Sequence, residues 1–485
     1  MKIRISQIPS IRYFRRLAMC VVLLISFGQT AFIPQPQSPL PETTINLSPN
    51  MSSPLSILHT TLADQWFEQA NIVPTNPTPM MSFGYSVAID GDTVVVGAYW
   101  HHIPQTGGGA AYVFTKPETG WPGITQVAKL SASDIGFHDQ FGWSVAISGN
   151  TIVVGSIYHN DPGMYKNGSA YVFVKPDSGW TDMTETAKLT ASDTQNMDEF
   201  GRDVAIDGDT IIVGVPFDDV DANADQGSVY VYVKPPGGWT NSTETAKLNA
   251  SDGAPGDLLG YSVDINLDTI VAGAYGHNNG AGVGEGQAYV FNQSGGWVSG
   301  TENARLTALD SFDHEYFGFS VAVDGDLVVV GAPGENTFDR SGSDSAYIFI
   351  KPVAGWIGDL NEDAILSASD GNIADDFANK VAASGDVVVV GAPLDDIETV
   401  VDQGSAYVYS KPVSGWVSMT ETDKLTASNG VETDKFGTSV SVRNNTIVVG
   451  APQHSFSGND DIGSAYIFDP QAVEMKVLYL PILIR

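Results

Sequence analysis

The sequence predicts an all-β fold in which seven four-stranded antiparallel blades form a β-propeller. A Phe-Gly pair, or a close variant of it, recurs seven times, and the successive first positions lie 58, 59, 59, 58, 60 and 59 residues apart. A period of this length indicates one small sheet per repeat. Each repeat also contains four short apolar runs and no sustained helical period. The pairs begin at Phe83, Phe141, Phe200, Leu259, Phe317, Phe377 and Phe436.

The third repeat shows the four expected strands in order, at residues 201–206, 210–215, 228–234 and 246–251. Asp207-Gly208 stands between the first two, and this dipeptide favours a tight hairpin turn. The second run is nearly all valine and isoleucine, which is typical of a strand buried on both faces. The third run alternates between aromatic residues and valine, as expected where side chains point to opposite faces in turn.

The chain ends favour a closed ring over an open stack. The seventh repeat stops at residue 470, before its fourth strand. Residues 69–84, near the N-terminus, align without gaps on residues 186–201, which contain the fourth strand of the second repeat. An N-terminal strand near residues 70–74 is therefore expected to complete the last blade, as in propellers that close by strand exchange. The C-terminal segment 475–485 is apolar enough to compete for this position.

Four segments divide the chain. Residues 1–31 contain five basic residues followed by the apolar run 17–27, which predicts a secretory signal peptide. An uncleaved anchor is the alternative, but the run is shorter than the roughly 17–25 apolar residues of a spanning helix. Residues 32–62 are rich in Pro, Ser and Thr and predict a flexible linker. The propeller is expected at 63–470, followed by an apolar C-terminal tail at 471–485.

Composition restricts the class of partner. The net charge is −33, so nucleic acid and anionic lipid are repelled. The only cysteine, Cys20, lies in the predicted signal, so disulfides and thiolate chemistry are not expected in the exported chain. We expect a monomer that has no integral membrane span once the signal is removed.

One loop position per repeat predicts a ring of candidate ligand-binding residues. Four residues after the glycine that ends each second strand, every repeat has a titratable side chain. In an up-and-down blade this loop shares a face with the loop that leads into the next repeat, which also contains acidic residues. Hydrogen bonding within the turns is the alternative explanation for such recurring polar side chains. The ring residues are His101, His159, Asp218, His277, Glu335, Asp395 and His454.

The third repeat contains the strongest local case for a cation. Asp219, Asp221, Asn223 and Asp225 stand at alternate positions, as in part of a calcium-binding EF-hand loop. The glycine and the distal glutamate of that loop are missing. Ca²⁺ is therefore a possible ligand of this loop, and no other cofactor is expected.

Catalysis has less support in the sequence than binding. No GxSxG, HExxH or phosphate-binding loop occurs. Paired carboxylates precede nearly every repeat, whereas a catalytic pair for glycoside hydrolysis is expected only once. Six Gly-Trp motifs are expected to pack between blades, although tryptophan can also stack against sugars.

The repeats carry the motifs FGxSVAxDGD, VVVGAP at residues 328–333 and GSAYVF at residues 168–173. In these motifs the chain resembles the FG-GAP repeat proteins over roughly residues 70–470. That family is similar to the seven-bladed propeller of integrin alpha subunits, and its bacterial members are mostly exported or surface proteins. The calcium loop DxDxDGxxD of integrin-type repeats is absent, so those calcium sites do not transfer to this chain.

Together these features predict an exported or cell-surface binding or adhesion scaffold. It is expected to recognise an extracellular protein or glycan through loops on one propeller face, with calcium as a possible aid, and not to be an enzyme. One alternative is a secreted enzyme that acts on polysaccharide with a carboxylate pair on one blade. The other is a structural surface component.

Overall fold

The computed structural model describes residues 65–100, 108–278, 284–293, 295–309, 315–334, 344–372, 374–455 and 461–471. These residues belong to one compact unit, Leu62–Arg485, and are organised as seven sheets. The predicted signal peptide and linker lie outside the described residues, as does the predicted tail apart from Gln471. Within the described residues no helix is long and apolar enough to cross a membrane.

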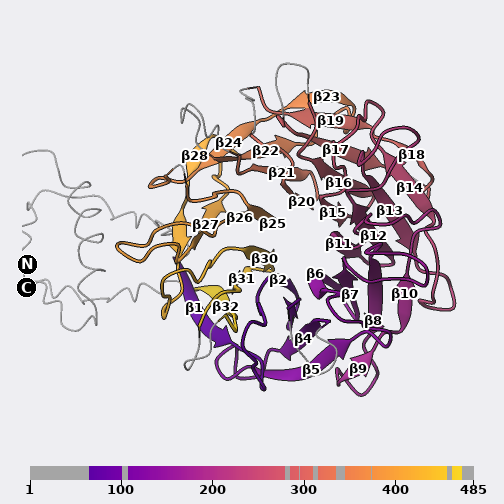
Figure 1. The fold of residues 1–485 in the computed structure, drawn as a ribbon. Helices are drawn as coiled ribbons and strands as arrows, with labels where there is room; N and C mark the ends of the chain where they lie inside the picture. The colour runs from indigo at the N-terminus through magenta and orange to yellow at the C-terminus, as the bar shows by residue number, and fades with distance from the viewer. Residues whose placement is uncertain are drawn as a thin grey trace, which may run out of the picture. The chain divides into compact units, whose positions relative to one another are not determined.

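Each sheet has four main strands that run in order from the axis of the ring to its rim (Figure 1). The innermost strands are β2 (Ser86–Asp90), β6 (Phe141–Ser148), β11 (Asp203–Asp207), β15 (Ser262–Asn266), β20 (Ser320–Asp324), β25 (Lys380–Ser384) and β30 (Ser439–Arg443). The second strands are β3 (Thr93–Ala98), β7 (Thr151–Ser156), β12 (Thr210–Val215), β16 (Thr269–Ala274), β21 (Leu327–Ala332), β26 (Val387–Ala392) and β31 (Thr446–Ala451).

The outer half of each blade contains two further strands. The third strands are β4 (Ala110–Thr115), β8 (Ser169–Val174), β13 (Ser228–Val233), β17 (Gln287–Asn292), β22 (Ser345–Ile350), β27 (Ser405–Ser410) and β32 (Ser464–Gln471). The rim strands are β5 (Thr125–Ser131), β10 (Ala187–Leu189), β14 (Ala246–Asn249), β19 (Ala304–Thr307), β24 (Ala364–Ser367), β29 (Asp423–Leu425) and β1 (Gln65–Ile72). The predicted seven-bladed β-propeller is therefore confirmed.

Four blades have a short fifth strand that the sequence did not predict. Each one belongs to the following repeat and pairs in parallel with the rim strand of the blade before it. This pairing links neighbouring blades at the rim. The four strands are β9 (Met183–Thr184), β18 (Gly300–Thr301), β23 (Gly358–Asn361) and β28 (Met419–Thr420).

The N-terminal strand closes the ring, as predicted. β1 pairs antiparallel with β32 and completes the last blade, so segments from both ends of the described chain share one sheet (Figure 1). The strand begins at Gln65 and not near residue 70. Trp66 is buried and anchors the earlier start, whereas Pro74 cannot donate a ladder hydrogen bond.

The core lies between the blades. In six of the seven second strands every residue is buried, which agrees with the predicted burial on both faces. Each hydrophobic cluster combines residues of two neighbouring blades. Five of the six Gly-Trp tryptophans are buried, and Trp297 packs against a cluster in part, so these side chains contribute to packing.

Carboxylates tie the rim strands together. Glu185, just before β10, accepts hydrogen bonds from the backbone amide and hydroxyl of Ser133, which follows β5. The same pair of bonds recurs with Glu244, Glu302 and Glu421. We call this contact the rim clamp. Glu68 in β1 forms it with Ser428 and so joins the N-terminal strand to the sixth blade.

Candidate ligand-binding site

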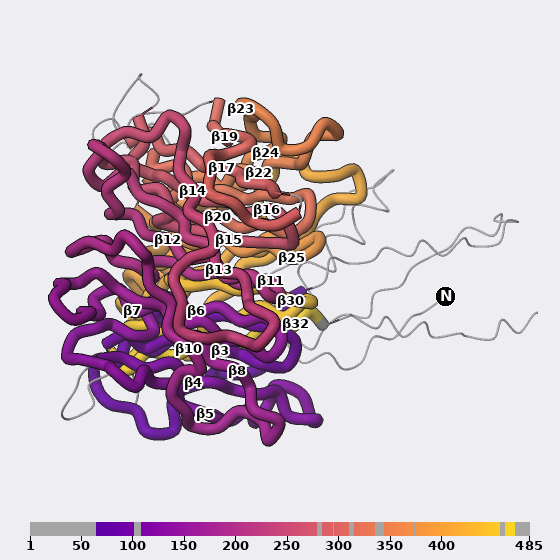
Figure 2. Tube along the Cα trace, turned by 90° about the vertical axis from the view of Figure 1, so that its right-hand side faces the viewer, coloured from indigo at the N-terminus to yellow at the C-terminus, as the bar shows by residue number. Residues whose placement is uncertain are grey.

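Two sets of loops share one face of the ring, which we call the upper face. They connect second to third strands, and rim strands to the inner strand of the next blade. The inner hairpin turns lie on the opposite, lower face, because consecutive strands are antiparallel. Figure 2 shows the ring edge-on, with the strands running between these two faces.

The predicted ring of polar residues lies in the upper-face loops, and the five described members are buried. Their exposed fractions range from 1% for Asp218 to 6% for His277. His101 and Glu335 lie outside the described residues. Side chains this deeply buried are held by neighbours within the protein. The five are His159, Asp218, His277, Asp395 and His454.

In three blades the ring residue is a histidine bonded to an aspartate of the preceding loop. The Nδ1 atom of His159 lies 2.7 Å from Oδ2 of Asp139, and the two equivalent pairs are 2.8 Å apart. Burial alone would lower the pKa of His159, but its hydrogen bonds to Asp139 and Asp161 raise that pKa to about 9. The ammonium of Lys188 lies 2.9 Å from Nε2 of the same ring and opposes this shift, so the histidine is held between a carboxylate and an ammonium.

In two blades the ring residue is an aspartate that faces another aspartate. Asp218 accepts a hydrogen bond from Tyr230 at 3.0 Å and pairs with Lys247 at 2.8 Å. Burial and the nearby carboxylates of Asp218, Asp219 and Asp193 raise the pKa of Asp198 to about 7, although a backbone hydrogen bond opposes the shift. Asp395 forms the same contacts with Tyr407 and Lys424.

The acids of the preceding loops are bound to the turns themselves. Asp139 accepts a hydrogen bond from the amide of Gly136 at 2.6 Å, and Asp198 accepts one from Gln195. The same bond recurs in three more blades. These contacts are those expected of recurring turn chemistry. The ligand-binding role of the ring stays a prediction.

The candidate calcium loop of the third repeat forms a tight hairpin. Val220 and Asn223 exchange backbone hydrogen bonds, and Asp219 accepts one from the amide of Asp225 at 2.9 Å. The sixth repeat forms the same hairpin, with Val400 in place of Asn223. Across the described residues, no three His, Asp or Glu side chains gather in a way that could hold a metal ion. Calcium binding by Asp219, Asp221, Asn223 and Asp225 stays a prediction.

The upper face also contains a cavity on the ring axis that the sequence analysis missed. Its volume is about 400 Å³. The residue that directly follows each Phe-Gly pair faces it, so every blade contributes one side chain. These seven residues differ from blade to blade, and all are half-buried. They are Tyr85, Trp143, Arg202, Tyr261, Phe319, Asn379 and Thr438.

Aromatic side chains form one wall of this axial cavity. Tyr85 packs against Tyr99 and Trp143 with ring centroids 4.4 and 4.7 Å apart. The guanidinium of Arg202 lies over the rings of Trp143 and Tyr261, at 4.9 and 4.3 Å. Such stacking on both faces fixes the arginine in place. The first four blades therefore present to the axis three aromatic side chains with the Arg202 guanidinium stacked between two of them.

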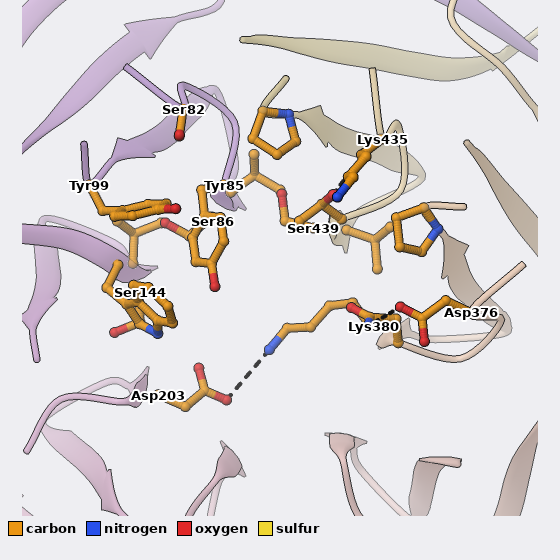
Figure 3. A pocket seen from close by; sticks show the side chains of 18 of the residues that line it. Ser82, Tyr85, Ser86, Tyr99, Ser144, Asp203, Asp376, Lys380, Lys435 and Ser439 are labelled. Carbon is orange, nitrogen blue, oxygen red and sulfur yellow. Dashed lines mark hydrogen bonds and ion pairs between the residues drawn. The ribbon is translucent and has the colours of Figure 1, made fainter. Parts of the chain in front are cut away.

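Polar side chains form the opposite wall, as Figure 3 shows for Asp376, Lys380 and Lys435. Lys380 reaches across the axis to Asp203, with Nζ and Oδ2 3.5 Å apart. In the other five blades this position is a serine, and Ser86, for example, donates a hydrogen bond to the carbonyl of Gly142 in the next blade. The third and sixth blades thus carry an ion pair at this position, and Asp203 also accepts hydrogen bonds from the hydroxyl of Ser262 and the amide of Val263 in the fourth blade.

This ion pair forms the floor of the axial cavity. Asp203 and Lys380 also line a second cavity of about 200 Å³, which lies below them along the inner strands. Asp264 lines that lower cavity and accepts hydrogen bonds from two backbone amides at 2.8 Å. Burial, with a contribution from nearby Asp203, raises the pKa of Asp264 to about 7. The pair therefore separates the upper mouth from the rest of the channel.

One signal in the sequence could have identified the axial cavity. Phenylalanine, glycine and serine recur around most of the pairs, but the residue that follows the pair is of six different kinds in the seven repeats. Variation at one position of an otherwise regular repeat indicates freedom from packing. Which position faces the axis, however, depends on how the blades pack.

Comparison with protein families supports the assignment of the repeats. A family model described as FG-GAP repeat matches seven consecutive stretches that together cover more than half of the chain. No curated protein matches the sequence. The matched stretches are residues 66–114, 124–173, 183–232, 242–291, 301–349, 360–409 and 419–468.

Proposed function

The chain belongs to the FG-GAP repeat family, and from this premise we propose that it is an exported or cell-surface binding scaffold. It recognises an extracellular protein or glycan through the upper face, and the axial cavity is the centre of that recognition. A ligand pocket combines apolar and aromatic walls with a few placed polar groups. The axial cavity has this composition.

The observation that carries the proposal is the contrast between the loops and the axis. The described polar side chains of the loop ring are buried and bonded within their turns. The seven side chains around the axial cavity are half-exposed and differ from one blade to the next. Repeated residues maintain the ring, so the varied residues are the ones free to select a ligand.

The surrounding fold supports binding because it is closed and stiff. Rim clamps link neighbouring blades, and the N-terminal strand is held by both β32 and Ser428. A preorganised site loses little conformational freedom when its ligand binds. The propeller is therefore well suited to hold seven side chains of six kinds around one point.

Binding is favoured over catalysis for the same cavity. Two carboxylates, Asp203 and Asp376, line it, and a glycosidase would need such a pair. Asp203, however, is bonded to Lys380 and to the hydroxyl and amide groups of the fourth blade. A carboxylate used in this way is a structural group, so we propose a binder and not an enzyme.

Two surface variants test the proposal. The variant Phe319→Lys places a charge at the mouth of the axial cavity, and Val353→Lys places one on the lower face, where Val353 is fully exposed. Wild type and both variants are screened against an array of extracellular-matrix proteins and glycans. We expect ligands that bind the wild type and Val353→Lys but not Phe319→Lys. The proposal would be overturned if every ligand bound Phe319→Lys as well as the wild type, or if no array member bound the wild type.

Export is part of the proposal and rests on the basic and apolar composition of residues 1–31. N-terminal sequencing of protein recovered from culture medium and from the cell surface tests it. We expect the mature chain to begin near residue 32. Recovery of the intact N-terminus from the cell interior alone would contradict export.

A further inference from the structure

We propose that the axial cavity binds a saccharide of one or two rings that carries a carboxylate. This inference rests on the proposed binding function and specifies the chemistry of its ligand. The aromatic wall of Tyr85, Tyr99 and Trp143 faces the cavity. Aromatic rings offer an apolar surface with a polar edge, which suits the C–H face of a pyranose ring.

The opposite wall supplies hydrogen-bonding groups. Asn379 donates to Asp376 at 2.7 Å and keeps its carbonyl oxygen as an acceptor, Asp376 can accept further bonds, and Lys435 donates. All three are half-buried. Asp376 and Lys435 lie across the mouth from the aromatic wall (Figure 3). Sugar hydroxyls both donate and accept, so a wall with both kinds of group matches them.

Charge distinguishes an acidic sugar from a neutral one. Three of the 23 lysines and arginines of this acidic chain line the axial cavity. Arg202 is paired with Glu199 at 3.2 Å, and Lys380 is paired with Asp203. Lys435 makes no ion pair with any described residue. Its ammonium is therefore the group that a ligand carboxylate would meet, in a charge-assisted hydrogen bond.

The size of the cavity sets the length of the ligand. Its volume of about 400 Å³ is near the small end of the range of roughly 300–1,000 Å³ found for ligand pockets. Asp203 and Lys380 line both this cavity and the lower one, so their ion pair lies between the two. One or two sugar rings fill such a space, and a longer chain would continue outward across the upper face.

The test is calorimetric titration of the full chain with three probes. Digalacturonate carries carboxylates, digalactose is its neutral counterpart, and hippurate is a carboxylate with an aromatic ring but no sugar. Lys435→Met removes the unpaired charge and Trp143→Leu removes part of the aromatic wall. The matched controls are Lys411→Met, a lysine paired with Asp386 outside the cavity, and Phe137→Ala, an exposed aromatic outside the lining.

We expect the wild type and both controls to bind digalacturonate more tightly than digalactose or hippurate. Lys435→Met should weaken digalacturonate binding about tenfold, which corresponds to about 1.4 kcal/mol, and leave digalactose binding unchanged. Trp143→Leu should weaken both disaccharides. Because the ammonium of Lys435 makes no ion pair within the described residues, we expect Lys435→Met to fold and to remain informative even if Trp143→Leu does not fold.

Other outcomes separate this inference from the function it rests on. Equal affinity for the two disaccharides, tighter binding of hippurate, or binding unaffected by Lys435→Met would each overturn the acidic-sugar inference. A protein ligand from the array that is lost in Phe319→Lys would preserve the binding function while the saccharide inference fails. No binding of any probe or array member would contradict both.

Discussion

At the scale of single residues, the recurring Phe-Gly pair is explained by contact between blades. Phe141 is fully buried, and Gly142 has a φ of +91°. A Cβ atom on Gly142 would lie 2.3 Å from the carbonyl oxygen of Ala110 in the preceding blade. Glycine meets both requirements without strain. Six of the seven blades have glycine at this contact with the neighbouring blade, and in the sixth blade Ala378 occupies the position with a φ of +67°.

A pair of substitutions separates the two requirements. Gly149, in the hairpin turn of the same blade, has a φ of +55° but no atom near its ideal Cβ position. We expect Gly149→Ala to lower the free energy of unfolding by about 1 kcal/mol, from backbone strain alone. Gly142→Ala should cost clearly more, because the clash is added to the strain. Chemical denaturation measures both, and equal losses would contradict the close-packing explanation.

Equivalent aspartates in neighbouring blades have opposite electrostatic surroundings. Asp139 is hydrogen-bonded to the His159 ring, whereas Asp198 faces the carboxylate side chain of Asp218. The folded-state pKa of Asp198, about 7, lies above its ordinary value, so the folded protein retains a proton that the unfolded chain has released. The contribution of the Asp198 carboxyl to the free energy of unfolding therefore falls as pH rises from about 4 to 7.

Amide substitutions at these two positions should act in opposite directions. We expect Asp198→Asn to raise the free energy of unfolding at pH 8 by on the order of 1–2 kcal/mol, and by less at pH 5. Asp139→Asn should be destabilising, most clearly below pH 6.5, where the raised pKa of His159 contributes fully. Denaturation at both pH values measures the effects. Destabilisation by Asp198→Asn at pH 8 would contradict this account.

At the scale of strands and loops, ring closure depends on β1 and its rim clamp. The amide and hydroxyl of Ser428 both donate to Glu68 at 3.0 Å, and the amide of Trp66 donates to Asp423 at 2.9 Å. The clamp at Glu185 is chemically the same but lies inside the continuous chain. Loss of the terminal clamp should therefore loosen the strand, which then keeps the ladder with β32 and the weaker set of contacts to the sixth blade from Trp66 and Asn71.

Hydrogen exchange can detect this difference. We expect Glu68→Ala to accelerate amide exchange across residues 65–72, because two hydrogen bonds worth about 1 kcal/mol each are lost. Glu185→Ala, the matched control, should leave exchange in residues 65–72 unchanged. Unchanged exchange across residues 65–72 in Glu68→Ala would contradict this role of the clamp and would mean that the remaining contacts of the strand, above all its pairing with β32, are enough to protect it.

The third-repeat loop is explained by turn hydrogen bonds that need no cation. Its hairpin recurs in the sixth repeat, where the oxygen-bearing Asn223 is replaced by Val400. We therefore expect calcium to leave the melting temperature unchanged, with the Asp219, Asp221 and Asp225 to Ala variant as control. A saturable rise in melting temperature that the variant loses would instead establish the predicted calcium site.

How far the sequence determines each feature depends on whether the feature is local. The strands, the Asp-Gly hairpins and the N-terminal closing strand follow from short patterns, and all are found in the structure. The rim clamp escaped prediction because it joins Ser133 to Glu185 across two repeats. The axial cavity also escaped prediction, because Tyr85 and Lys380 line the same cavity only once the blades have packed into a ring.

At the scale of the whole molecule, near sevenfold regularity makes any irregularity informative. The second strands and the Phe-Gly contacts are nearly the same in every blade, and five rim clamps join neighbouring blades within the described residues. The axis is where the blades differ most, with an aromatic wall, a polar wall and one ion pair across the centre. The blades are therefore nearly alike except where they line the axial cavity, and we expect ligand recognition at that cavity.

The central claim is that ligands bind at the axial cavity, and hydrogen-exchange mapping of the complex tests it most directly. The tightest-binding ligand from the array is added to the full chain, and amide protection is compared with that of the free protein. We expect new protection in the segments that line the mouth, around residues 82–87, 143–145, 202–203, 379–380 and 435–440. Protection confined to the outer loops or to the lower face would contradict the claim.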